Sequence, residues 1–216
     1  MKTLALIRRR ADLGRDAFRA HYEDVHAPLA IATLLDGTRR YVRHHLREDL
    51  FGEPRFDVVT AFWYPDAAAA LAVRRRLDGP AGEGIARDEA SFMDRAANTF
   101  FAVSERPVLG AERRDAGLCA LALVRRPPGR SAAAFAADYE RRELPRLLDA
   151  LRAPVWCLHN TALRFGADDP AFDVVTQLHA AADAGLADWA DELAASGARV
   201  VVAAVSEHES ALGQPA

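Results

Sequence analysis

An internal repeat constrains the fold of this chain of 216 residues more than any other feature. Two segments carry the same residue types at the same spacing: Phe18, Tyr22, Glu23 and Pro28 in the first, and Phe135, Tyr139, Glu140 and Pro145 in the second. The sequence Phe-Asp-Val-Val-Thr at 56–60 likewise recurs at 172–176. A period of more than about 100 residues is too long for a solenoid, so each copy should be a small domain.

Each copy is predicted to contain a strand, a helix, two strands, a helix and a strand. In the first copy the strands are expected at 3–9, 39–46, 56–64 and 99–104, with helices opening at Asp12 or Gly14 and running over 66–77 and 87–95. In the second copy the strands are expected at 118–125, 155–163, 172–179 and 199–206, with helices at 131–150 and 184–195. This order is typical of the ferredoxin-like α+β fold, with two helices on one face of an antiparallel sheet.

The exposed faces of two such sheets need cover, and two sheets packed face to face can close into one α/β barrel. The sequence therefore predicts tandem ferredoxin-like repeats that form a pseudo-dimeric barrel within one chain, with a pocket in its interior. We expect domains at 1–106 and 117–209, joined by a polar linker at 107–116 that contains Pro107 and Gly110.

Composition narrows the class of protein. Half of the residues are hydrophobic, so the chain can bury a substantial core. The net charge of −3 does not favour a nucleic-acid-binding protein, which usually has a clustered basic face. No apolar run reaches the length of a membrane span or a signal-peptide core, and we therefore expect a cytoplasmic protein without a membrane partner.

The first helix carries both a packing stripe and a candidate chemical group. Phe18, Tyr22, Val25 and Leu29 fall on one side at helical spacing, whereas Glu23 and Asp24 are expected to point away. His26 lies at the edge of the stripe. Because Pro28 lacks an N–H, regular helix should end or kink just after His26, which would place the imidazole at a helix C-terminus.

The strand at 39–46 has polar residues on both faces. Alternation places Tyr41, Arg43 and His45 on one face, and Arg40, Val42 and His44 on the other. Of the adjacent His44 and His45, only one can therefore face a barrel interior. In the second copy His159 aligns with His44.

Neither a metal nor a cofactor is expected. Cys119 and Cys157 lie in predicted strands without metal-ligand spacing, and we interpret both as small buried hydrophobic residues. No His or carboxylate pair has the spacing of a known metal motif. No glycine-rich phosphate-binding loop supports a nucleotide or a flavin.

Four stretches of the first half identify a family. They are the first strand with its arginines, the motif Phe18-x-x-x-Tyr22-x-x-x-His26-x-Pro28-Leu29, the strand Arg40–His45, and Asp88–Asp94 leading to Phe100–Glu105. In these stretches, which span nearly all of 1–106, the chain resembles the EthD domain family of dimeric α/β-barrel proteins. The second copy resembles the fold pattern only, since it has Glu143 in place of His26 and lacks the segment around 88–92.

The resemblance implies a barrel that holds a small organic molecule. Related dimeric α/β barrels include polyketide cyclases, cofactor-independent monooxygenases and isomerases of aromatic-degradation pathways. Because fold fixes architecture better than reaction, the site residues must carry the functional argument. We expect the pocket to be built mainly from the first half, which keeps the histidine.

Candidate roles follow, each beside a structural alternative. His26 is the first choice for a general acid or base, assisted by Tyr22, His44 or His45; as the alternative, His26 hydrogen-bonds the last carbonyls of its helix. Arg40 and Arg43 are candidates to polarise a carbonyl or hold a carboxylate or phenolate, or else form strand-edge ion pairs. Tyr41 and Trp63 are candidates for an aromatic lining of the pocket, or else fill the core.

Three functions stay open at this point. The leading one is a cofactor-free enzyme that cyclises, dehydrates or isomerises a small aromatic or polyketide-like compound by proton transfer. The second is a cofactor-independent monooxygenase, in which a deprotonated phenolic substrate reacts with O₂. The third is a barrel that binds its ligand without turnover. The chain is also a candidate to form a homodimer.

Overall fold

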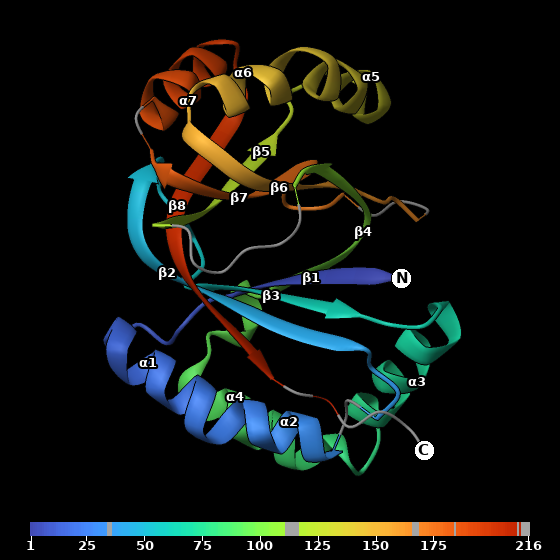
Figure 1. Cartoon of the computed structure of the whole chain (residues 1–216). Coiled ribbons are helices and arrows are strands. Elements are labelled where there is room, and N and C mark those ends of the chain that lie inside the picture. Colours follow the sequence, from blue (N-terminus) through green and yellow to red (C-terminus); the bar gives the residue numbers. More distant parts are fainter. Residues whose placement is uncertain (34–35, 111–116, 166–168, 184, 211, 213–216) are drawn as a thin grey trace. The chain divides into compact units, whose positions relative to one another are not determined.

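A computed structural model describes residues 1–33, 36–110, 117–165, 169–183, 185–210 and 212, and Figure 1 shows the whole chain. The fold is mixed α/β, and its eight antiparallel strands follow the order β1-β3-β2-β8-β5-β7-β6-β4 of a closed barrel. The chain divides into two compact units. Unit 1 comprises Met1–His45, Arg55–Ala102 and Glu207–Ala216, and unit 2 comprises Leu46–Pro54 and Val103–Ser206.

Unit 1 holds the first and third strands, parts of the second, fourth and last strands, and the helices between them. Its elements are β1 (Lys2–Ile7), α1 (Arg15–His21), the π-helical turn η1 (Tyr22–His26), α2 (Ala27–Thr33), the first half of β2 (Arg40–Phe51), β3 (Val58–Trp63), α3 (Ala67–Asp78), α4 (Gly82–Phe92), the 3₁₀ turn η2 (Arg95–Ala97) and the start of β4 (Thr99–Leu109). Strand β3 pairs antiparallel with both β1 and β2. Figure 1 shows α1, α2 and α4 along one face of these strands, where Phe18, Tyr22, Ile85 and Phe92 are buried together.

Unit 2 has a similar order of elements, but one helix instead of two precedes its last strand. Its elements are β5 (Leu118–Arg125), α5 (Ala132–Asp138), the π-helical turn η3 (Tyr139–Glu143), α6 (Leu144–Asp149), β6 (Arg152–Ala162), β7 (Val174–Ala182), α7 (Leu186–Ala195) and most of β8 (Arg199–Ser210). Strand β7 lies between β5 and β6. A core that includes Phe135, Tyr139, Leu147 and Trp189 fills the space between sheet and helices.

Regular α-helix is interrupted before His26 rather than just after it, and His26 does not lie at a helix C-terminus. Helix α1 passes into the π-helical turn, where the N–H of Ala27 bonds to the carbonyl of Tyr22, and α2 then continues to Thr33. A π-helical turn contains one extra residue, so the hydrogen-bond ladder changes its pairing at this point. Pro28, which has no N–H to contribute, is tolerated there. His26 consequently lies inside a continuous helical segment.

The observed bounds of the other elements agree with the predicted ones in part. The strand expected at 118–125 is confirmed as β5. Helix α4 begins at Gly82 rather than at 87, and β2 continues to Phe51. Strand β4 extends to Leu109, into the predicted linker at 107–116, and residues 111–116 of that linker lie outside the described part. The division into domains at 1–106 and 117–209 stays a prediction.

Among the described residues, no helix has the length and apolar character that crossing a membrane would require.

Candidate functional site

His26 is held by a carboxylate that the helix pattern alone did not reveal. Its Nδ1 lies 2.8 Å from Oδ2 of Asp88, a residue of α4, and its side chain is only 7% exposed. Because a carboxylate can only accept, Nδ1 carries the proton and Nε2 keeps the lone pair. Burial lowers the pKa of His26, while Asp88 partly offsets that effect. The ring is therefore neutral at pH 7 and able to accept a proton at Nε2.

A second histidine shares the same carboxylate. His21 places Nε2 2.8 Å from Oδ1 of Asp88, so the two carboxylate oxygens bridge two imidazoles that are five positions apart in the sequence. The Phe92 ring packs against both, with centroid distances of 4.4 Å to His21 and 5.3 Å to His26. Asp88 is thereby fixed in position. It belongs to the Asp88–Asp94 segment on which the family resemblance rests.

Tyr22 lies between two of the three predicted catalytic histidines, His26 and His45. Its ring makes edge contacts with His26 at 5.0 Å and with His45 at 5.4 Å. Its hydroxyl lies 2.9 Å from Oγ1 of Thr60 on β3. Burial raises the pKa of Tyr22 to about 12, so the phenol stays protonated at neutral pH. Tyr22 can position both rings and donate a hydrogen bond, but it cannot serve as a base.

Glu23 is the residue that sequence reasoning misplaced. It was expected to point away from the core, yet its side chain is 16% exposed and its carboxylate accepts hydrogen bonds from two β2 residues. Oε1 lies 2.6 Å from Nε2 of His45 and 3.1 Å from Nε of Arg43. Burial would raise the pKa of Glu23, but these two donors hold it at about 2. The wider π-helical turn explains the direction, since it departs from regular helical spacing at residue 22.

The guanidinium of Arg43 has several partners within unit 1. Besides the Glu23 carboxylate, it donates 2.7 Å to Oγ of Ser210 and reaches the carbonyl of Tyr41 at 3.5 Å. It also lies over the Tyr41 ring, 4.5 Å from the centroid. Both side chains are buried. Arg43 thus joins the Glu23 carboxylate to the Tyr41 ring and to Ser210.

His44 and His45 lie on opposite faces of β2. His45 faces the helices, contacts Phe18 and Tyr22, and has its Nδ1 buried without a hydrogen-bond partner among the described residues. Burial lowers its pKa, so this ring is also neutral. His44 lies on the face away from the helices, with Nε2 3.2 Å from Oε2 of Glu207. The structure therefore does not bring His44 together with His26.

Arg40 and Trp63 form a separate group. The Arg40 guanidinium and the Lys2 ammonium lie over the Trp63 ring at 4.7 and 4.2 Å from its centroid. Arg40 also pairs with Glu209 through Nε and Oε1 at 3.1 Å. The contacts described for Arg40 and Trp63 thus involve Lys2 and Glu209.

The equivalent position in unit 2 differs from the one we predicted. In the antiparallel register of unit 1, Thr60 lies opposite Arg43. The counterpart of Thr60 in the repeated Val-Val-Thr is Thr176, which lies opposite His159. His159 therefore corresponds to Arg43 rather than to His44. Burial lowers the pKa of His159 to about 4, and Glu140 reaches its Nε2 only at 3.7 Å. In place of the buried Glu23–Arg43 pair, unit 2 has an ion pair between Glu140 and Arg106, whose side chains are 40% and 50% exposed.

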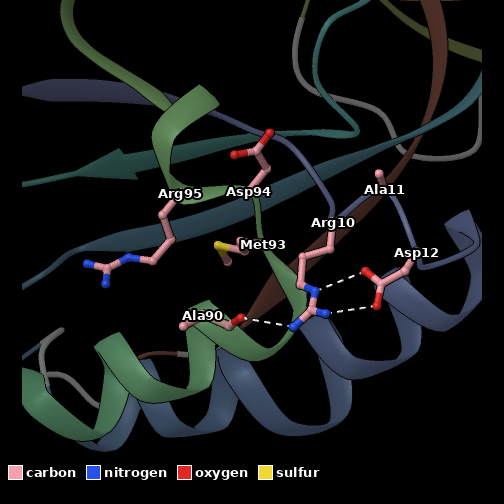
Figure 2. A pocket seen from close by; sticks show the side chains of 7 residues that line it. All are labelled: Arg10, Ala11, Asp12, Ala90, Met93, Asp94 and Arg95. Atoms are coloured by element: carbon pink, nitrogen blue, oxygen red, sulfur yellow. Dashed lines mark hydrogen bonds and ion pairs between the residues drawn. The ribbon is translucent and has the colours of Figure 1, made fainter.

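A hollow of about 490 Å³ lies elsewhere on unit 1. Figure 2 shows it between the loop after β1 and the end of α4, lined by Arg10, Ala11, Asp12, Ala90, Met93, Asp94 and Arg95. Arg10 donates to both carboxylate oxygens of Asp12, at 2.9 and 2.8 Å. None of the predicted site residues lines this hollow.

Cys119 also departs from the sequence interpretation. It is half-buried rather than a core residue, and its Sγ lies 3.3 Å from Nε2 of His179. Cys157 is buried as expected, and burial raises its pKa to about 12.

Comparisons with known proteins agree with this architecture. No curated protein matches the sequence. An anthrone oxidase-like protein superposes with a TM-score of 0.60 at 12% identity, over 99% of this chain and 93% of that chain. A candidate monooxygenase from Fusobacterium nucleatum subsp. nucleatum gives a TM-score of 0.51 at 9% identity, over 94% of this chain and 91% of that chain. Such identities show the fold alone.

The EthD domain model matches residues 10–96. This stretch contains His21, Tyr22, Glu23, His26 and Asp88, the residues that meet around η1. The expected resemblance is thus confirmed for this part of the chain. Over residues 10–96 this chain is similar to the EthD domain family.

Proposed function

We propose that unit 1 carries an enzyme site in which His26 transfers protons on a small aromatic or polyketide-like compound, without a cofactor. The observation that carries the proposal is the contact between Nδ1 of His26 and Asp88 at 2.8 Å. It leaves Nε2 as a proton acceptor on a ring that burial keeps neutral. A general base of this kind typically contributes about 10²- to 10⁴-fold in rate.

The other residues act around this pair. Asp88 holds the tautomer, and Tyr22 packs between His26 and His45. Glu23 and Arg43 hold His45, whose neutral ring is the second candidate for a proton carrier. His44, Arg40, Tyr41 and Trp63 stay candidates for catalysis or substrate binding. The reaction class is cyclisation, dehydration or isomerisation, each of which needs only proton transfers.

A second candidate is a cofactor-independent monooxygenase. It is favoured by the similarity of the fold to two solved structures, of which one is anthrone oxidase-like and the other a candidate monooxygenase. In this case His26 deprotonates a phenolic substrate, and the phenolate supplies electrons to O₂. A binding barrel without turnover is the remaining alternative.

The wider organisation belongs to the same proposal. The chain is a duplication of ferredoxin-like copies at 1–106 and 117–209, joined by 107–116, and only the first copy keeps the histidine site. The similar order of elements and the paired π-helical turns η1 and η3 support it. A cytoplasmic location, a homodimer, and the absence of nucleic-acid and membrane partners are part of the proposal.

The test uses the full chain and a panel of phenolic, anthrone-type and linear polyketide-like compounds. Product formation is followed by mass spectrometry, and O₂ uptake by an electrode. We expect His26→Gln to lower kcat by about 10²-fold or more. Glu143→Gln, the equivalent position in unit 2, is the matched control and should turn over like the wild type.

Each outcome selects one reading. Turnover without O₂ uptake supports acid and base chemistry, whereas stoichiometric O₂ uptake supports the monooxygenase. Unchanged compounds that nevertheless bind tightly would leave the non-catalytic barrel. Wild-type turnover by a folded His26→Gln variant would refute the role of His26.

A further inference from the structure

A thiol and an imidazole meet on the sheet of unit 2, apart from the residues used above. Cys119 on β5 and His179 on β7 are direct partners in the strand register, so their side chains leave the same face of the sheet. Sγ of Cys119 lies 3.3 Å from Nε2 of His179. The two residues are 60 positions apart in the sequence. Strand pairing alone brings them together.

The separation of these two atoms suits a metal ion. A tetrahedral zinc ion binds sulfur at about 2.3 Å and imidazole nitrogen at about 2.0–2.1 Å, which places the two ligand atoms roughly 3.5 Å apart. The observed 3.3 Å is close to that distance. An ion could therefore be bound by both atoms with little movement of either strand.

The surroundings hold His179 in place and leave Cys119 partly accessible to solvent. His179 is 2% exposed, and the Trp156 ring packs edge-on against it with centroids 5.0 Å apart. The imidazole is thus held in one orientation. Cys119 is half-buried, in contrast with Cys157, which lies in the core of unit 2. Ring orientation fixed by neighbours is what metal-binding histidines generally need.

We propose that Cys119 and His179 are two ligands of a site for a thiophilic divalent ion of the zinc class. Water or further nitrogen and oxygen donors complete the coordination. On binding, the thiol loses its proton to solvent and the thiolate forms the bond to the metal, so no oxidant or reductant is involved. This site is independent of the proposed chemistry at His26.

The experiment titrates tag-free, full-length protein with Co²⁺, whose thiolate complexes have characteristic charge-transfer absorption, and then adds Zn²⁺ as competitor. We expect one thiolate-bound Co²⁺ per chain, displaced by Zn²⁺. Cys119→Ser should abolish the charge-transfer band, and His179→Gln should weaken binding by at least about tenfold. Cys157→Ala is the matched control and should retain the wild-type spectrum.

A measurement on the unmodified chain covers the case in which a variant fails to fold. Zn²⁺ should slow the alkylation of Cys119 by iodoacetamide at least about tenfold, as read by peptide mass spectrometry. Affinity should also fall as the pH is lowered, because protons compete for both ligands. Absence of the charge-transfer band in the wild type, or alkylation of Cys119 at the same rate with and without Zn²⁺, would overturn the proposal.

Discussion

At the scale of single residues, the partner of His26 decides how its ring titrates. Asp88 raises the pKa of His26 against the larger, lowering effect of burial. Asp88→Asn removes the negative charge and keeps the shape, so the pKa of His26 should fall further. Its ring C–H chemical shift, followed by NMR as a function of pH, measures the change. An unchanged or higher pKa in the variant would contradict the assignment of Asp88 as the holding group.

Glu23 supports a second prediction at this scale. Glu23→Gln leaves the Arg43 guanidinium, whose side chain is 4% exposed, without its counter-charge. Breaking a buried ion pair in this way typically costs about 3–5 kcal/mol of unfolding free energy. The matched variant is Glu140→Gln, at the equivalent, 40% exposed position of unit 2. Its cost should stay below about 1 kcal/mol.

Urea unfolding curves of the two variants and the wild type measure both values. Equal losses in the two variants would show that Glu23 is no more important for stability than a surface carboxylate.

Sequence reasoning found some of these residues and missed others. It selected His26, Tyr22 and the alternation of β2, because spacing along one element is visible in a sequence. It could not pair His26 with Asp88 or Cys119 with His179, since those contacts depend on the packing of α4 and on strand register. The Asp88–Asp94 segment was noticed only as part of the family motif. Its role needed the structure.

At the scale of elements, irregular helix geometry explains the principal error. The pattern predicted an end or a kink just after His26, whereas the irregularity is a π-helical turn at 22–26, after which the helix continues to Thr33. The same turn places Glu23 against β2. A single inserted residue is not distinguishable from a helix end by hydrophobic spacing alone.

Two glycines of one helix supply a matched prediction. A Cβ at Gly82 would lie 1.8 Å from the carbonyl oxygen of Leu77 in α3, whereas a Cβ at Gly84 would meet nothing within 4 Å. Gly82→Ala should therefore cost about 2–3 kcal/mol through forced separation of α3 from α4. Gly84→Ala should stabilise the protein by about 0.5–1 kcal/mol, because glycine is costly inside a helix. Thermal and urea unfolding of both variants measure these changes in unfolding free energy. A Gly82→Ala protein as stable as the wild type would contradict the prediction, because it would mean that α3 and α4 can move apart at no cost.

At the scale of the whole molecule, buried histidines should make the fold sensitive to acid. Burial lowers the pKa of His26, His45 and His159, in the last case to about 4. Below their ordinary value of about 6.5 the unfolded chain binds more protons than the native one, so unfolding free energy falls as pH falls. His159 alone accounts for a loss on the order of 3 kcal/mol by about pH 4.

Urea unfolding between about pH 7.5 and pH 4.5 should show this decline. His159→Gln, which keeps a hydrogen-bonding group opposite Thr176, should make the decline less steep. Parallel pH curves for variant and wild type would contradict the assignment.

The exchange of chain segments between the units has a consequence for synthesis. Unit 1 draws its last strand segment from residues beyond Ser206, and Arg43 bonds to Ser210 there. Domains generally fold as they leave the ribosome, N-terminal first. Here unit 1 is translated first but cannot complete its fold until unit 2 has been synthesised. Until then Arg43 lacks its hydrogen bond to Ser210. We therefore expect a chaperone of nascent chains to bind the N-terminal half of this protein while it is still incompletely folded.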